Sequence, residues 1–200
     1  MSMQVKLADI AEIGSGGTPS RKNIEFYGGD IPWIKSGELN KRFISRSEEF
    51  LTEKGLKNSS AKMVPKGSIL FAMVGATLGK TSLLKINAAI NQNICYIIPK
   101  NQIVDTNYLH NFLVYNYSKI KGMGSGGAQK IISQKVIKQI DIPVIPILEQ
   151  RKIVGILDQA HALIEKKEEA LNLYNRIIPS LFYKYFGNPI NFSEDNTIAD

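Results

Sequence analysis

The sequence has very few of the residues that build disulfides, metal sites and membrane spans. Its single cysteine, Cys95, excludes an internal disulfide and lies in an apolar run, where we expect a small buried side chain. Only two histidines occur, and neither stands near a cluster of acidic residues, so we expect no metal site. No apolar run approaches the roughly 18 residues that cross a bilayer.

The first ten residues carry charges at Lys6 and Asp9 and lack the apolar segment of a secretory signal. Together with the missing membrane spans, this favours a cytoplasmic chain without membrane contact.

Motifs of common enzyme classes are also missing. Residues 74–81 place Gly-Lys-Thr after an apolar strand, but only three residues separate Gly75 from Gly79, one fewer than a phosphate-binding loop requires. The two glycine-rich loops lack the dinucleotide-binding spacing, and no Gly-x-Ser-x-Gly elbow occurs. We therefore predict no catalytic residue in this chain, although Thr77 and Lys80 could contact a phosphate of another kind, such as that of DNA.

Positive charge is unevenly distributed along the chain. The net charge is +7, yet residues 1–146 hold 19 Lys+Arg and 10 Asp+Glu, a balance of +9, whereas residues 147–200 hold 6 and 8, a balance of −2. Excess positive charge on one part indicates a polyanionic partner there, with nucleic acid before membrane. The alternative is a basic surface that is solvated and inert.

Residues 1–146 are typical of a mixed α and β domain with many loops, since glycine and proline interrupt them at short intervals. The clearest strands are residues 68–74 and 94–98, each a short apolar run. Apolar spacing predicts a helix over 105–120, with Asp105 or Thr106 at its N-terminus, and a short helix over 131–140. The fold class we predict is α+β, a mixed α/β domain followed by a long coiled-coil-forming helix.

Residues 147–187 predict this long helix, and residues 188–200 a C-terminal tail. Pro179 predicts a kink or a restart within the helix. Steps of four and three give an apolar stripe that only Lys167 interrupts. A single helix cannot bury such a stripe, so it needs a helical partner, in the same or another chain, or must pack on its own domain. The stripe consists of Ile153, Leu157, Ala160, Ile164, Leu171, Tyr174, Ile178, Leu181 and Tyr185.

Loops of the basic part interleave cations with amides, hydroxyls and aromatic residues, as in residues 21–23, 33–36, 57–62 and 91–93. Cations supply the salt-dependent attraction to phosphates, and Asn, Gln, Arg and Lys can read base edges in the major groove. Each cluster alone also fits an ordinary polar loop.

Seven motifs in order resemble the specificity subunit of type I restriction–modification systems. They are Gly-Gly-Thr-Pro-Ser (16–20), Gly-Gly-Asp-Ile-Pro-Trp-Ile-Lys (28–35), Pro-Lys-Gly-Ser-Ile-Leu (65–70), Gly-Ala-Thr-Leu-Gly-Lys (75–80), Ile-Asn-Gln-Asn (90–93), Gly-Gly-Ala-Gln-Lys (126–130) and Ile-Pro-Val-Ile-Pro-Ile-Leu-Glu-Gln (142–150). The helix after Gln150 is similar to the spacer helix of that family, and the resemblance covers roughly residues 5–187.

The resemblance implies a non-catalytic subunit whose target recognition domain, here residues 1–146, reads a half-site in double-stranded DNA. It implies a helix that docks methyltransferase subunits, a restriction subunit as a further partner, and S-adenosylmethionine bound by the methyltransferase rather than by this chain. The resemblance and the polar loops together suggest a set of DNA-contacting residues. These candidates are Arg21, Lys22, Lys35, Ser36, Lys41, Arg42, Lys57, Asn58, Ser59, Thr77, Lys80, Asn91, Gln92, Gln129 and Lys130.

Full-length members of that family carry two recognition domains and two helices, whereas one of each is found here. The chain is therefore a natural half-subunit or one half of a longer chain. We expect an antiparallel homodimer through residues 150–186, which would place two domains on a symmetric, split target. The alternative is a protein-interaction adaptor that acts through its helix and has no DNA specificity of its own.

Overall fold

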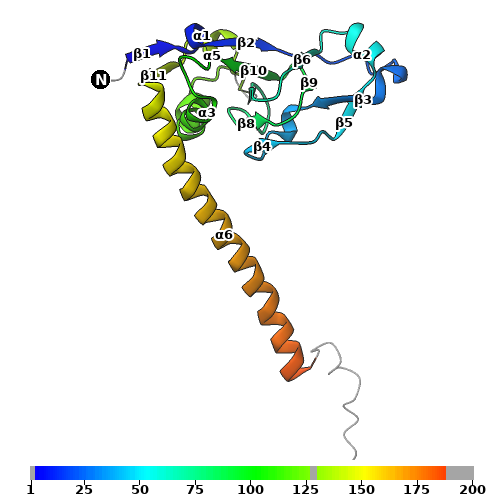
Figure 1. The fold of residues 1–200 in the computed structure, drawn as a ribbon. Coiled ribbons are helices and arrows are strands. Elements are labelled where there is room, and N and C mark those ends of the chain that lie inside the picture. The colour runs from blue at the N-terminus through cyan, green and yellow to red at the C-terminus, as the bar shows by residue number, and fades with distance from the viewer. Residues whose placement is uncertain (1–2, 127–129, 188–200) are drawn as a thin grey trace, which may run out of the picture. The chain divides into compact units, whose positions relative to one another are not determined.

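The computed structural model describes residues 3–126 and 130–187, which form two compact units divided between Val154 and Gly155. The first unit, called the globular domain below, contains two β-sheets, a small strand pair and short helices (Figure 1). The second unit contains the rest of a long helix. The predicted class, a mixed α/β domain followed by a long helix, is confirmed.

A five-stranded sheet in the order β2-β10-β7-β8-β4 forms the centre of the globular domain. Its neighbouring strands are antiparallel except for β4 and β8, which are parallel. The strands are β2 (Ala11–Ser15), β4 (Phe43–Ile44), β7 (Ile69–Ala72), β8 (Thr81–Leu84) and β10 (Ile94–Pro99).

A second sheet in the order β5-β3-β9-β6 lies against the first, and β3 and β9 are its parallel pair. Its strands are β3 (Tyr27–Ile34), β5 (Glu49–Leu51), β6 (Lys62–Val64) and β9 (Ala88–Ile90). At the other end of the domain, β1 (Met3–Lys6) pairs with β11 (Asp141–Val144) (Figure 1).

The core explains why the two predicted strands are continuous apolar runs. On β7, Ile69 and Phe71 pack against the helices, whereas Leu70 and Ala72 pack against the second sheet. A strand buried on both faces needs apolar residues at every position. Cys95 on β10 is fully buried, and burial raises the pKa of its thiol to about 12, which leaves it protonated and unreactive.

Helices cover the other face of the five-stranded sheet. They are α1 (Leu7–Ile10), α3 (Thr106–Tyr115), α4 (Tyr117–Gly122) and α5 (Gln134–Lys138); α2 (Glu53–Lys57) and the 3-10 turns η1 (Ile24–Phe26) and η2 (Ser36–Glu38) lie beside the second sheet.

Two predicted helices are shorter in the structure than the sequence suggests. Asp105 caps α3 as expected, since its Oδ1 accepts from the N–H groups of Asn107 and Tyr108. The helix ends at Asn116, whose Nδ2 donates to the Phe112 carbonyl, and α4 then starts anew. The second helix, α5, begins only after Ser133, because Ile131 forms β-bridges instead.

Residues 75–80 connect two antiparallel strands, and β8 follows them where a phosphate-binding loop would need a helix. Gly75 and Gly79 have φ angles of +80° and +82°, a conformation that L side chains rarely adopt. The glycines therefore serve a tight turn between strands, in agreement with the rejection of an ATP-binding loop.

The helix α6 (Ile147–Phe186) runs without interruption through Pro179, so no restart occurs there. The residues around Pro179 are exposed, so water can bind the carbonyl that loses its helical partner. The sequence divides the chain at residue 146, but the first two turns of α6 belong to the globular domain. The predicted tail, 188–200, lies outside the described residues.

Gln150 anchors the start of α6 in the globular domain. Its side chain is fully buried, and its Oε1 accepts from the Asp105 N–H at 2.8 Å. Its Nε2 donates to the carbonyl oxygens of Ile103 at 3.0 Å and Ile145 at 2.7 Å. One amide thus partners three backbone groups in two other segments, residues 103–105 and Ile145.

The Gln150→Leu variant keeps the side-chain size and removes both polar atoms. We expect a loss of about 2–4 kcal/mol in unfolding free energy, because a buried N–H and two carbonyls lose their partners. Urea unfolding followed by circular dichroism measures this loss. The control Gln4→Leu, at an exposed strand position, should change stability by less than about 0.5 kcal/mol. Equal losses in the two variants would contradict the anchoring role.

Candidate nucleic-acid interface

Three loops that are distant in sequence meet around Gly17. Its N–H donates to the Ile90 carbonyl at 3.0 Å, and its carbonyl accepts from the Trp33 indole N–H at 3.2 Å. A Cβ on Gly17 would lie 2.1 Å from the Ser60 Oγ and 2.4 Å from the Ser60 backbone carbon, closer than atoms can approach. Glycine at this position therefore lets the loops before η1, after α2 and after β9 pack together.

The loop after β9 contributes Asn91 and Gln92, which have different surroundings. Asn91 is buried, and its Oδ1 accepts from the Asn93 N–H, so it shapes the turn. Gln92 is exposed, and its side-chain carbonyl accepts from the Thr18 hydroxyl. Gln92 thus keeps an amide group at the surface beside the Gly17 loop.

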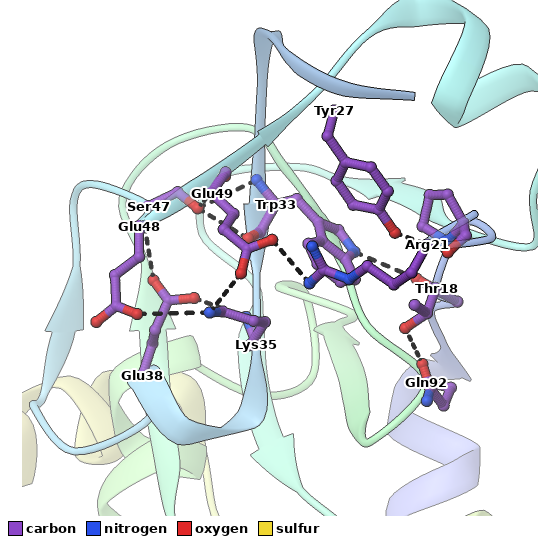
Figure 2. Close-up of polar contacts among 12 residues, drawn as sticks. Thr18, Arg21, Tyr27, Trp33, Lys35, Glu38, Ser47, Glu48, Glu49 and Gln92 are labelled. Atoms are coloured by element: carbon purple, nitrogen blue, oxygen red, sulfur yellow. Dashed lines mark hydrogen bonds and ion pairs between the residues drawn. The ribbon is translucent and has the colours of Figure 1, made fainter. Parts of the chain in front are cut away.

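Arg21 and Lys35 share one carboxylate (Figure 2). Glu49 places its Oε2 2.8 Å from the Arg21 Nη2 and its Oε1 2.7 Å from the Lys35 Nζ. The Arg21 guanidinium also lies over the rings of Tyr27 and Trp33, at 4.4 and 5.2 Å from their centroids. We call these five residues the Arg21 network.

The Arg21 network rests on rigid partners. The Trp33 side chain is buried, its ring meets that of Tyr27 edge to face at 5.9 Å, and the Tyr27 hydroxyl donates to the Pro19 carbonyl at 2.7 Å. The Trp33 N–H donates to the Ser47 hydroxyl at 3.1 Å, which ties β3 to the residues before β5. The rings of Tyr27 and Trp33, called the aromatic floor below, are therefore held in place under Arg21.

Ion pairing shifts the titration of the network. The hydrogen bond from Lys35, with help from Arg21, holds the pKa of Glu49 below its usual value, and the same bond raises the pKa of Lys35. Burial raises the pKa of Glu38, although the backbone N–H groups of Lys35 and Glu48 partly oppose this. Acidic side chains thus surround Lys35, since Glu48 also lies 3.6 Å from its Nζ.

A second group of predicted residues consists of Ser36, Lys41 and Arg42, which follow Lys35 in sequence, and of Thr77, which contacts Ser36. The Thr77 hydroxyl donates to the Ser36 carbonyl at 2.9 Å and joins the β7–β8 loop to η2. The Lys41 carbonyl accepts from the Ser82 hydroxyl at 2.6 Å, and the Arg42 guanidinium lies 5.0 Å from the Phe43 ring centroid. An open hollow of about 400 Å³ adjoins this group, with both cations and acids among its lining residues, which are Glu38, Asn40, Lys41, Phe43, Ile44, Ser45, Arg46, Ser47 and Glu48.

The third group, at the end of α2, has local structural partners. Lys57 pairs with Glu53 at 2.9 Å, Asn58 donates from Nδ2 to the Lys54 carbonyl at 2.9 Å, and the Ser59 Oγ accepts from the Ala61 N–H at 3.2 Å. These contacts account for the three side chains without a ligand, although the three residues precede Ser60, which lies against Gly17.

The remaining cations differ in their pairing with acids. Within residues 3–126 and 130–187, no ion pair joins Lys22, Lys41, Lys80 or Lys130 to a carboxylate, and all four residues are exposed. Their charge is therefore available to an anionic partner. Gln129 lies outside the described residues.

Sequence reasoning missed Glu49 and the aromatic floor made by Tyr27. A signal was present, because Glu48 and Glu49 are adjacent acids in a part of the chain that is otherwise rich in cations. Their ion pairing with Arg21 and Lys35 could not be read from the sequence, since it depends on the antiparallel pairing of β3 with β5.

The apolar stripe on α6 is exposed, with Leu171 at 61% and Tyr174 at 65%. Ile156 and Leu163 are also exposed and fall on the same side of a regular helix, although the heptad spacing did not include them. The stripe therefore offers an exposed apolar surface that Lys167 interrupts.

Among the residues that the structure describes, no three His, Cys, Asp or Glu side chains are grouped so that they could hold a metal ion. Over the same residues, every helix is too short or too polar to cross a membrane.

The lowered pKa of Glu49 gives a pH-dependent prediction. The stability that this group contributes is fully present above its unfolded pKa of 4.5 and is lost as the pH falls through the lower folded value. We expect wild type to be more stable than Glu49→Gln at about pH 7, and the difference to shrink as the pH falls below 4.5. Urea unfolding over this range measures it. A difference that did not change with pH would contradict the ionised pair.

Comparisons with known proteins agree on one family. The model of the type I restriction modification DNA specificity domain matches residues 2–173. The MjaIX specificity subunit of Methanocaldococcus jannaschii is 34% identical over 185 residues, 90% of this chain and 43% of the relative. The EcoR124I/EcoR124II specificity subunit of Escherichia coli is 33% identical over 177 residues, 84% and 44% of the two chains. This chain thus spans less than half the length of these curated relatives.

Solved structures share the fold. A chain from a type I restriction–modification complex has a TM-score of 0.74 at 20% identity and covers 90% of this chain and 43% of its own length. The HsdS subunit from Thermoanaerobacter tengcongensis has a TM-score of 0.66 at 21% identity, with 84% and 39% covered. Family model, sequence relatives and fold agree, and the chain belongs to the type I restriction–modification DNA specificity family.

Proposed function

We propose that this chain reads one half-site of a split target in double-stranded DNA, as a non-catalytic specificity subunit of a type I restriction–modification complex. The observation that carries the proposal is the match to the specificity-domain family over 2–173, which includes every loop that meets around Gly17. The proposal places the chain in the cytoplasm, with the DNA that it reads.

Exposed lysines and exposed amides would have different roles in DNA binding. Lys22, Lys41, Lys80 and Lys130 have no carboxylate partner among the described residues, so their charges suit DNA phosphates. Gln92 presents an exposed amide beside the Gly17 loop, and amides can read adenine in the major groove. Phosphate contacts would fix the position on the duplex, while the polar loop groups would supply specificity.

The helix α6 would supply the contacts to other subunits. Its exposed apolar stripe suits a second copy of the chain in antiparallel orientation, which would complete the pair of recognition domains. Methyltransferase and restriction subunits would dock on the resulting helix pair, and S-adenosylmethionine would be bound by the methyltransferase. The exposed stripe also supports the adaptor alternative, in which the helix acts without DNA reading by the loops.

Selection from randomised duplex DNA, with the full chain alone and together with its methyltransferase subunit, tests DNA reading. We expect a split palindrome in the bound pool. Lys41→Ala and Lys80→Ala should weaken binding to all sequences alike and lower the slope of log K against log salt by about 1 each. The control Lys100→Ala, at the far end of β10, should leave both unchanged. Failure of any sequence to be enriched would favour the adaptor.

Charge in the stripe should prevent dimerisation. We expect Leu157→Glu with Leu171→Glu to convert a dimer to a monomer in sedimentation velocity, because paired helices would bury unpaired carboxylates. Asn172→Glu adds the same charge next to Leu171 but outside the stripe, and should leave the dimer intact. A monomeric wild-type chain, or equal effects at both sites, would contradict the antiparallel pair.

A further inference from the structure

Arg21 is held in one orientation before any ligand binds. Its guanidinium lies over the rings of Tyr27 and Trp33, and its Nη2 is 2.8 Å from the Glu49 Oε2 (Figure 2). The side chain is nevertheless 56% exposed. Because the Arg21 side chain is already ordered by folding, it loses little conformational entropy on binding. Its remaining N–H donors face solvent and are held in one plane.

The surroundings of Arg21 do not favour a phosphate. The two cations of the network, Arg21 and Lys35, are accompanied by three carboxylates, those of Glu38, Glu48 and Glu49. Glu49 is 30% exposed, so it also reaches the surface. The charge of Arg21 is already paired with that of Glu49, which distinguishes Arg21 from Lys41 and Lys80, whose side chains form no ion pair within residues 3–126 and 130–187.

The network instead presents donors and an acceptor side by side. A G·C pair offers the complementary pattern in the major groove, with acceptors at guanine O6 and N7 and a donor at the cytosine N4 amino group next to them. An A·T pair reverses the two inner groups, because adenine carries the N6 amino group and thymine the O4 acceptor. In an A·T pair the Arg21 donors would then face the adenine amino group, and the Glu49 carboxylate would face the thymine O4 acceptor.

We propose that Arg21 and Glu49 together read one G·C base pair: Arg21 donates to guanine O6 and N7, and Glu49 accepts from cytosine N4. The inference rests on the proposed function and adds the base pair and the two residues that recognise it. Lys35 is a positioning residue, since its Nζ holds the second oxygen of Glu49 at 2.7 Å. Tyr27 and Trp33 fix the plane of the guanidinium.

The test is the DNA selection repeated with substitutions in the network. In the wild-type pool we expect one position fixed as G·C in each half-site. Arg21→Lys keeps the charge and loses the planar donor pair, so it should lose that preference by on the order of 5- to 150-fold while the salt slope stays the same. Glu49→Gln should weaken the preference for G·C at the same position only in part, because its amide can donate to thymine O4 while Arg21 still faces the adenine amino group.

The matched control is Glu53→Gln, which removes the same charge from an exposed ion pair on α2 and should leave every position unchanged. Circular dichroism establishes that each variant is folded, and the conservative Arg21→Lys keeps the test valid if Glu49→Gln unfolds.

Two results would overturn the inference and leave DNA reading intact. One is a selected target in which neither Arg21→Lys nor Glu49→Gln weakens the base preference at any position. The other is a Glu49→Gln chain that binds all sequences more tightly and selects the same target. Glu49 would then only neutralise the charges of Arg21 and Lys35. A wild-type chain that enriches no sequence would instead remove the proposed function itself.

Discussion

The close approach of three loops to Gly17 determines how the candidate interface is built. Its backbone bonds to Ile90 and to the Trp33 indole leave no room for a side chain beside Ser60. Trp33 is thereby fixed in the core, and the Arg21 guanidinium lies over its ring and that of Tyr27. Polar side chains on loops thus gain defined positions, because a buried aromatic residue and a glycine contact fix the backbone beneath them.

Electrostatics divides the basic residues into two kinds. Arg21 and Lys35 are paired with Glu49, so their net contribution to long-range attraction of DNA is small. Lys41 and Lys80 form no ion pair with a carboxylate within the described part of the chain, so their charges act over about a Debye length. Sequence composition shows only the sum of these charges. Under the proposed function, the unpaired lysines would contribute to affinity and the paired Arg21 to base selection.

Much of the fold could be predicted because local patterns agree with the final packing. The runs around Ile69 and Ile94 are apolar at every position, as strands buried on both faces must be, and Asp105 caps α3 where a helix start was expected. The break at Asn116 was missed because apolar spacing continues across it. The short strands β5 and β6 were also missed, since three-residue strands have too little periodicity to recognise.

The candidate site was less predictable than the fold. Lists of basic and amide residues place Arg21, Lys35 and Lys57 in one class, but only the structure shows that the carboxylate of Glu49 joins the first two and that Lys57 pairs within its own helix. Strand pairing creates the Arg21 network from segments almost thirty residues apart, and no local pattern reports strand pairing.

The helix and the loops place opposite demands on the sequence. The stripe on α6 would need the same apolar residues over many turns if the proposed partner helix packs along its length. The loops around Gly17 need only the glycine and Trp33 to stay, while neighbouring polar positions can change without disturbing the core. A change from Glu49 to an amide, for example, would alter the pattern offered to a base pair and keep Trp33 in place. Under the proposed function, one framework could therefore carry many DNA specificities, provided that substitutions leave Tyr27 and Trp33 in place.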